Sequence, residues 1–210
     1  MSYVSGDGKP RRKIVLFLVG LIVFFSALYL SIDVSSTFHI PSLGFFKIGC
    51  IVGLVLELVA LFKLRQYDYA YTFCFILALI TGVSVLFGYP LYIIREFKFI
   101  ESPIIDFLYE LCSFIDSITE MLIMVIFVRA TNRLAEQSYK GMPKLTLALT
   151  IAYLICILVA TLEFLSLILK FTITNDFLGT LLAKIVGAAD IVRWVGIIIF
   201  LVYALHNIKD

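Results

Sequence analysis

Charged residues are scarce in this chain. Asp, Glu, Lys and Arg make up 15% of its 210 residues, whereas 62% are hydrophobic and the mean hydropathy is +1.07. Soluble domains usually have about a quarter of their residues charged. This deficit excludes a soluble enzyme, a disordered chain and a disulfide-rich scaffold. The net charge of only +2 also gives no indication that the protein binds nucleic acid.

Residues that bind transition metals or carry catalysis are also few. The sequence lacks the H-E-x-x-H, G-x-S-x-G and P-loop motifs, so it indicates no enzymatic activity. Its two histidines lie outside the longest apolar stretches, which argues against copper, zinc and haem, and we expect no cofactor. The cysteines are scattered through apolar stretches without C-x-x-C spacing, as is typical of packing residues. They are Cys50, Cys74, Cys112 and Cys156.

Long apolar stretches dominate what remains. A membrane-spanning helix needs about 20 mainly apolar residues. Six such stretches occur, at residues 14–31, 45–64, 70–94, 103–130, 144–169 and 177–205. We therefore predict an all-α, multi-pass membrane protein with six transmembrane helices in one bundle, surrounded by a lipid bilayer. In a bacterium, it would lie in the cytoplasmic membrane.

The distribution of Lys and Arg predicts the orientation of this bundle. Basic residues are concentrated in the N-terminal segment 1–13 and in the connections after the second and fourth spans. Because Lys and Arg accumulate in cytoplasmic loops, both termini are predicted to be cytoplasmic, including the tail 206–210. The first span also resembles the apolar part of a signal peptide, so its cleavage stays an alternative.

The fourth span carries an acidic face. At about 100° per residue, Glu110, Asp116 and Glu120 fall within one face of about 120°, and apolar residues lie opposite. A charge near the bilayer centre costs about 2–3 kcal/mol, so this face is expected to meet protein or water. Asp116 and Glu120 are one turn apart, where two anions repel each other. We expect one of them to hold a proton unless a cation is bound nearby.

The other spans supply further ionisable groups, in which acids outnumber bases. The acids are Glu57, Glu163 and Asp190, and the bases, predicted to act as counter-charges, are Lys184 and Arg193. Excess acid within a membrane implies protonated carboxyls, bound cations or a wetted cavity. Judged by depth, the candidate partners are Glu110 and Glu163 for Lys184, and Glu57, Asp116 and Glu120 for Arg193.

These charges predict a small transporter or channel-like protein for protons, metal cations or cationic solutes, because carboxylates suit such ligands. Asp116 and Glu120 would form the central pair, supported by Glu57, Glu110, Glu163 and Asp190. The identity of any metal stays open. One alternative is a non-enzymatic membrane subunit or sensor, which binds a partner membrane protein or a second copy through the acidic fourth span. The remaining alternatives are hydrogen bonds that only hold the bundle together and a membrane enzyme that uses Asp116 and Asp190.

Overall fold

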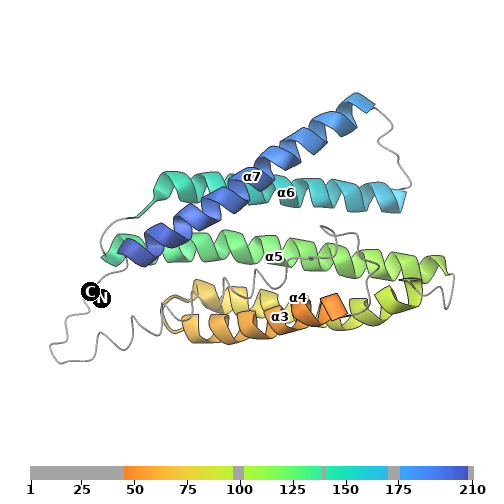
Figure 1. Ribbon diagram of the computed structural model, residues 1–210, viewed down its shortest axis with the longest axis horizontal. Coiled ribbons are helices and arrows are strands. Elements are labelled where there is room, and N and C mark those ends of the chain that lie inside the picture. Colours follow the sequence, from red (N-terminus) through yellow and green to blue (C-terminus); the bar gives the residue numbers. More distant parts are fainter. Residues whose placement is uncertain (1–44, 97–101, 139–140, 170–175, 208–210) are drawn as a thin grey trace.

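A computed structural model describes residues 45–96, 102–138, 141–169 and 176–207 of the chain. Over these ranges all of the regular secondary structure is helical, without a β-strand (Figure 1). The predicted first span, residues 14–31, and the segment 1–13 lie outside the described residues. The described helices are α3 (Phe45–Leu64), α4 (Ala70–Glu96), α5 (Pro103–Ser138), α6 (Pro143–Leu169) and α7 (Asp176–Asn207).

The ends of these helices fall close to the limits of the apolar stretches, except at the end of α5. That helix continues past residue 130 to Ser138. Its last turns contain Leu134, Ala135, Glu136 and Gln137, which are good helix formers although the segment is no longer apolar. Hydropathy marks where a helix leaves the bilayer, whereas helix propensity decides where it ends.

The outer surface of the described bundle is apolar. Among the described residues, four helical segments are long and apolar enough to cross a membrane, namely Ala70–Arg95, Pro103–Gln137, Pro143–Ile168 and Lys184–Ala204. On α7, the side chains of Ile191, Ile198 and Val202 are between 60% and 66% exposed. Large contiguous apolar surfaces of this kind are rare on soluble monomers and are expected where lipid covers the protein.

Helix α5 lies at the centre of the arrangement. Figure 1 shows α3 and α4 on one side of it and α6 and α7 on the other. Helix α7 crosses α6 at an angle, and its N-terminal half diverges from the rest of the bundle. We refer to the end of the bundle that carries Arg95 and Glu110 as the Arg95 end. The opposite end, which carries Arg129 and Arg133, is the Arg129 end.

Small residues bring α4 and α5 close together. They recur along α4 at spacings of three and four, which places them on one face of the helix. The Thr81 and Thr119 hydroxyls are hydrogen-bonded across the interface at 2.6 Å, and the Ser84 hydroxyl donates to the Cys112 carbonyl at 2.7 Å. The small residues of this α4 face are Cys74, Ala78, Thr81, Ser84 and Gly88.

The Arg129 end of the α3–α4–α5 interface is a dry apolar core. Fully buried side chains from all three helices meet there, so the core blocks water at this end. They include Leu61, Leu64, Tyr71, Cys74, Ile123 and Phe127. Towards the Arg95 end, polar side chains replace this core.

A buried hydrogen bond links the two long helices within this core. The hydroxyls of Tyr71 and Thr131 lie 2.8 Å apart, and the Tyr71 ring packs edge-on against Phe127. We expect Tyr71→Phe to lower the free energy of unfolding by about 1 kcal/mol, because it leaves the Thr131 hydroxyl without this partner. Thr131→Val should cause a similar loss. Reversible unfolding in mixed micelles measures both, and a double variant whose loss equals the sum of the two would contradict the direct bond.

Candidate functional site

Three of the predicted acids, one on α3 and two on α5, lie close enough to interact electrostatically. Glu57 on α3 is only 4% exposed, and it interacts electrostatically with Asp116 on α5. Glu120, one turn further along α5, interacts electrostatically with both. Asp116 and Glu120 are half-buried. We refer to Glu57, Asp116 and Glu120 as the carboxyl cluster.

Among the described side chains, Arg193 on α7 is the base that lies beside this cluster. Its guanidinium interacts electrostatically with Glu120 and lies 5.5 Å from the centre of the Tyr153 ring, a cation–π geometry. Tyr153 is buried on α6, so the contact ties α6 and α7 to the acidic face of α5. One guanidinium can balance only one of the three carboxylates. The cluster can therefore also hold a proton or a further cation.

The cluster lies about halfway along the part of α5 that is long enough to cross a bilayer. At about 1.5 Å per residue, Glu110 and Arg129 are about 28 Å apart along α5. This length is close to the hydrocarbon thickness of a bilayer, about 30 Å. Glu120 lies about 15 Å from Glu110 on the same scale, so it sits roughly halfway between the two charged ends.

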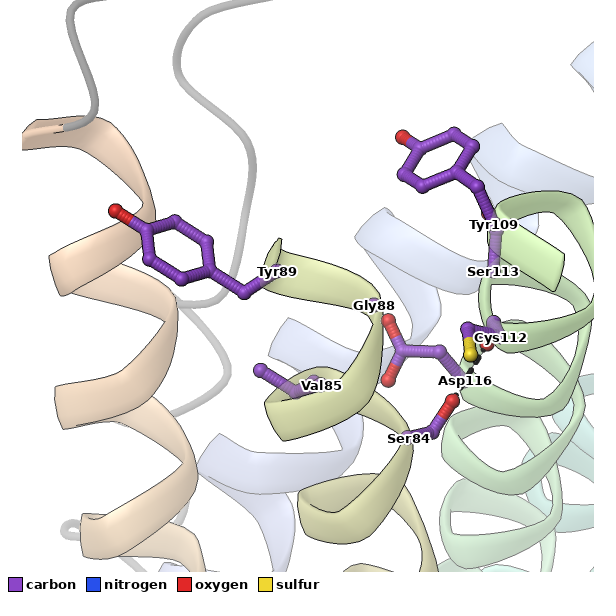
Figure 2. Close-up of a pocket in the computed structure, with 8 residues that line it drawn as sticks. All are labelled: Ser84, Val85, Gly88, Tyr89, Tyr109, Cys112, Ser113 and Asp116. Carbon is purple, nitrogen blue, oxygen red and sulfur yellow. Dashed lines mark hydrogen bonds between the residues drawn. The ribbon is translucent and has the colours of Figure 1, made fainter. Parts of the chain in front are cut away.

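A pocket of about 110 Å³ connects Asp116 with the Arg95 end. It lies between α4 and α5 and is partly open. Figure 2 shows the Asp116 carboxylate projecting from α5 towards the turn of α4 between Ser84 and Gly88. Because Gly88 has no side chain, this wall of the pocket is backbone. The lining consists of Ser84, Val85, Gly88, Tyr89, Tyr109, Cys112, Ser113 and Asp116.

An ion-pair group stands at the Arg95 end of this pocket. Arg95 binds Glu110 at 2.7 Å and Asp106 at 3.4 Å, and its guanidinium lies 5.0 Å from the centre of the Tyr109 ring. The Arg95 side chain is 44% exposed. Glu110 therefore belongs to the exposed end of the bundle, with Arg95 rather than Lys184 as its ion-pair partner.

The remaining predicted residues lie apart from the carboxyl cluster. Glu163 on α6 and Lys184, in the N-terminal half of α7, have exposed side chains. The side chain of Asp190 lies outside what the structure describes. The predicted enzyme pair of Asp116 and Asp190 is therefore not described either.

Some lining residues of the pocket were not predicted as site residues. Ser84, Gly88 and Cys112 lack charge, so a search for ionisable groups passes over them. A different signal was available in the regular spacing of small residues along α4, which marks a close helix contact. That spacing would have placed Ser84 and Gly88 against the fourth span.

The described side chains do not favour a chelated metal ion. Among them, no three His, Cys, Asp or Glu residues are arranged so that they could hold a metal ion together. A proton needs only one carboxyl group, and an organic cation can be held by a carboxylate and aromatic rings. The described geometry therefore suits these two ligands better.

Within the described residues, the apolar exterior and the four helices able to cross a membrane indicate a multi-pass integral membrane protein. Comparisons with protein-family models, with characterised proteins and with solved structures find no match. We therefore infer the function from the geometry of the carboxyl cluster and its pocket.

Proposed function

We propose that the protein moves protons or small organic cations across a membrane, with Glu57, Asp116 and Glu120 as the binding site. The carboxyl cluster carries this proposal, because three acids gather beside one base at mid-depth and adjoin a pocket. An uncompensated charge at this depth is costly, so acids retained there usually serve a pathway or bind a ligand.

The pocket gives the cluster access from one side. A cation enters past Tyr109 and Arg95, meets the Ser113 hydroxyl and reaches Asp116. Glu120 and Glu57 then offer the next carboxyl groups. Beyond them, the dry core closes the path to the Arg129 end. Transport therefore requires that this core opens in a second conformation, as alternating access demands.

We further propose six membrane helices with both termini in the cytoplasm. The Arg129 end would face the cytoplasm, because basic residues accumulate on that side of a membrane and this end carries Lys63, Arg65, Arg129 and Arg133. The pocket then opens to the opposite side of the membrane.

The described packing favours transport over partner binding through the acidic face of α5. Glu57 and Arg193 of the same chain already lie beside that face, and Asp116 points towards α4. A partner that bound there would first have to displace these helices.

Flux through the purified protein tests the proposal. The full chain is reconstituted into liposomes that contain a pH-sensitive dye, and a pH gradient is imposed with potassium and valinomycin to clamp the voltage. A second assay follows the uptake of radiolabelled methylammonium. We expect Asp116→Asn to reduce the transported species' flux at least about tenfold, because the amide cannot carry a proton or a charge. Glu163→Gln removes an exposed acid and should leave the flux unchanged.

Two results would contradict the proposal. One is a wild-type flux no greater than that of protein-free liposomes in both assays. The other is a flux that Asp116→Asn and Glu163→Gln leave equally intact. A stoichiometric membrane partner that is lost from the purified Asp116→Leu/Glu120→Leu variant would then favour the alternative role as a subunit.

A further inference from the structure

A second pocket lies at the Arg129 end, between α5 and α6. Its volume is about 440 Å³, which is within the usual range of small-molecule sites. Arg129 is about 14 Å from Glu120 along α5, so this pocket is separate from the carboxyl cluster. The lining residues are Ile126, Arg129, Asn132, Arg133 and Thr146.

Two hydrogen-bond donors in this pocket have no partner among the described residues. The Thr146 side chain is 8% exposed, and its hydroxyl oxygen is buried without a hydrogen bond to any of them. Arg129 likewise makes no ion pair or hydrogen bond within the described part of the chain. An unsatisfied buried hydroxyl costs about 1–3 kcal/mol, so native proteins usually provide it with a partner. A ligand with acceptor oxygens would reach Arg129 directly, and it would satisfy the Thr146 hydroxyl once this side chain turns to its other staggered rotamer.

The other polar side chains that line this pocket, Asn132 and Arg133, are held in place by hydrogen bonds and an ion pair. Asn132 donates to Glu136 at 2.8 Å and accepts a hydrogen bond from the backbone nitrogen of Met142 at 2.6 Å. Arg133 lies 3.4 Å from Asp68 in an exposed ion pair, which leaves most of its guanidinium accessible. The nearby acids are therefore engaged by Asn132 and Arg133, and Arg129 keeps its charge for a ligand.

The pocket also has the electrostatics of an anion site. Thr146 belongs to the first turns of α6, which begins at Pro143. The N-terminal end of a long helix carries about half a positive charge and favours anions. Together with two guanidinium groups, this end of α6 makes the pocket suitable for a phosphate.

We propose that this pocket binds the phosphate of an anionic membrane phospholipid. Arg129 lies at the depth of the headgroups, one bilayer thickness from Glu110 along α5. Ile126 lines the pocket on the side facing the membrane interior. Exposed apolar side chains then continue along α6 and offer a surface to acyl chains; they are Leu147, Ile151, Leu154 and Leu158. Basic pockets between helices at the cytoplasmic surface commonly bind such lipids.

Thermal unfolding of the purified full chain in a neutral detergent tests this site. The probes are dioctanoyl phosphatidylglycerol, dioctanoyl phosphatidylcholine and inorganic phosphate. We expect phosphatidylglycerol to raise Tm in a saturable manner, because a ligand that binds only the folded protein stabilises it. Phosphatidylcholine should shift Tm much less, and inorganic phosphate should not reproduce the full effect.

Thr146→Val separates ligand binding from stability. The valine removes an unsatisfied hydroxyl, so Tm without lipid should stay the same or rise. The phosphatidylglycerol concentration for half the maximal shift should increase about tenfold, which corresponds to one lost hydrogen bond to a charged group. Arg129→Gln should weaken the response at least as much. Lys63→Gln removes an exposed base at the same end of the bundle and should leave the response unchanged.

Three outcomes overturn the inference. Both lipids carry a phosphate, and the choline cation makes phosphatidylcholine neutral overall, so equal shifts with the two would mean that the net negative charge of the headgroup is not recognised. A loss of response in Lys63→Gln as large as in Arg129→Gln would mean general attraction to basic residues. A full shift with inorganic phosphate would assign the pocket to a soluble anion instead of a lipid. None of these results bears on the carboxyl cluster, because every variant in this test leaves its acids intact.

Discussion

Gly88→Leu is expected to abolish flux through the protein without removing any ionisable group. A Cβ atom at position 88 would lie 3.2 Å from the Cβ of Cys112, which is already a tight contact. The rest of the leucine side chain would then fill most of the cavity of about 110 Å³ in front of Asp116. Alternatively, α4 and α5 would separate, at a cost of about 1–3 kcal/mol. In both cases the path from the Arg95 end to the carboxyl cluster is blocked or distorted.

Two measurements check this expectation. The first is the liposome flux described above, which should fall at least about tenfold, as for Asp116→Asn. The second is the rate at which N-ethylmaleimide labels Cys112, which lines the same pocket, as followed by peptide mass spectrometry. This rate should also fall, because the leucine covers the thiol.

Gly187→Leu is the matched control. Gly187 lies on α7, and a Cβ there would meet nothing within 4 Å. This variant adds the same side chain to the same kind of helix, so its flux and its labelling rate should equal those of the wild type. Unchanged flux in Gly88→Leu, together with slower labelling of Cys112, would show that the transported species does not use this pocket.

The positions of the helices could be predicted well from the sequence. Helix α3 has the predicted limits of 45 and 64, and α7 begins at Asp176, one residue before the predicted start. This success has a physical reason, because a chain in lipid must satisfy its backbone within each helix. A long apolar stretch therefore defines its own secondary structure. The total of six spans stays a prediction, since residues 14–31 lie outside the described part.

The neighbours of the helices could not be predicted in the same way. Glu110 pairs with Arg95, whereas depth alone suggested Lys184. The connection between α4 and α5 is short, so the end of one helix lies beside the start of the next, and this hairpin brings Arg95 to Glu110. Lys184 is exposed because the N-terminal half of α7 diverges from the bundle, and a crossing angle leaves no mark in hydropathy.

The acidic face of α5 shows what the periodicity of the sequence can predict and what it cannot. Periodicity showed that Asp116 and Glu120 share a face that avoids lipid, and both are half-buried within the bundle. Periodicity did not show that Asp116 points towards α4 while Glu120 interacts with Arg193 on α7. These contacts depend on uncharged residues such as Gly88, which decide how closely the helices approach.

The electrostatic interaction of Arg193 with Glu120 leads to the second large effect. Arg193→Met is expected to lower the free energy of unfolding by about 2 kcal/mol, because it leaves the carboxyl cluster without its base. Removing one partner of a fully buried ion pair lowers the free energy of unfolding by more than this. We expect a smaller loss here because Arg193 is half-buried. The methionine retains an apolar stem against Tyr153, so the loss reports mainly on charge.

A double-mutant cycle assigns this loss to a particular partner. Glu120→Gln removes the acid that Arg193 balances, so the combined variant Glu120→Gln/Arg193→Met should regain most of the stability lost in Arg193→Met alone. Lys184→Met, which removes an exposed base from the same helix, should change stability by less than about 0.5 kcal/mol. Reversible unfolding in mixed micelles gives the free energy of unfolding of each protein in the cycle: the wild type, the two single variants and the double variant. The same method measures the Lys184→Met control. If the losses of the two single variants simply add in the double variant, Arg193 does not act on Glu120, and Asp116 or Glu57 becomes the acid to test against it.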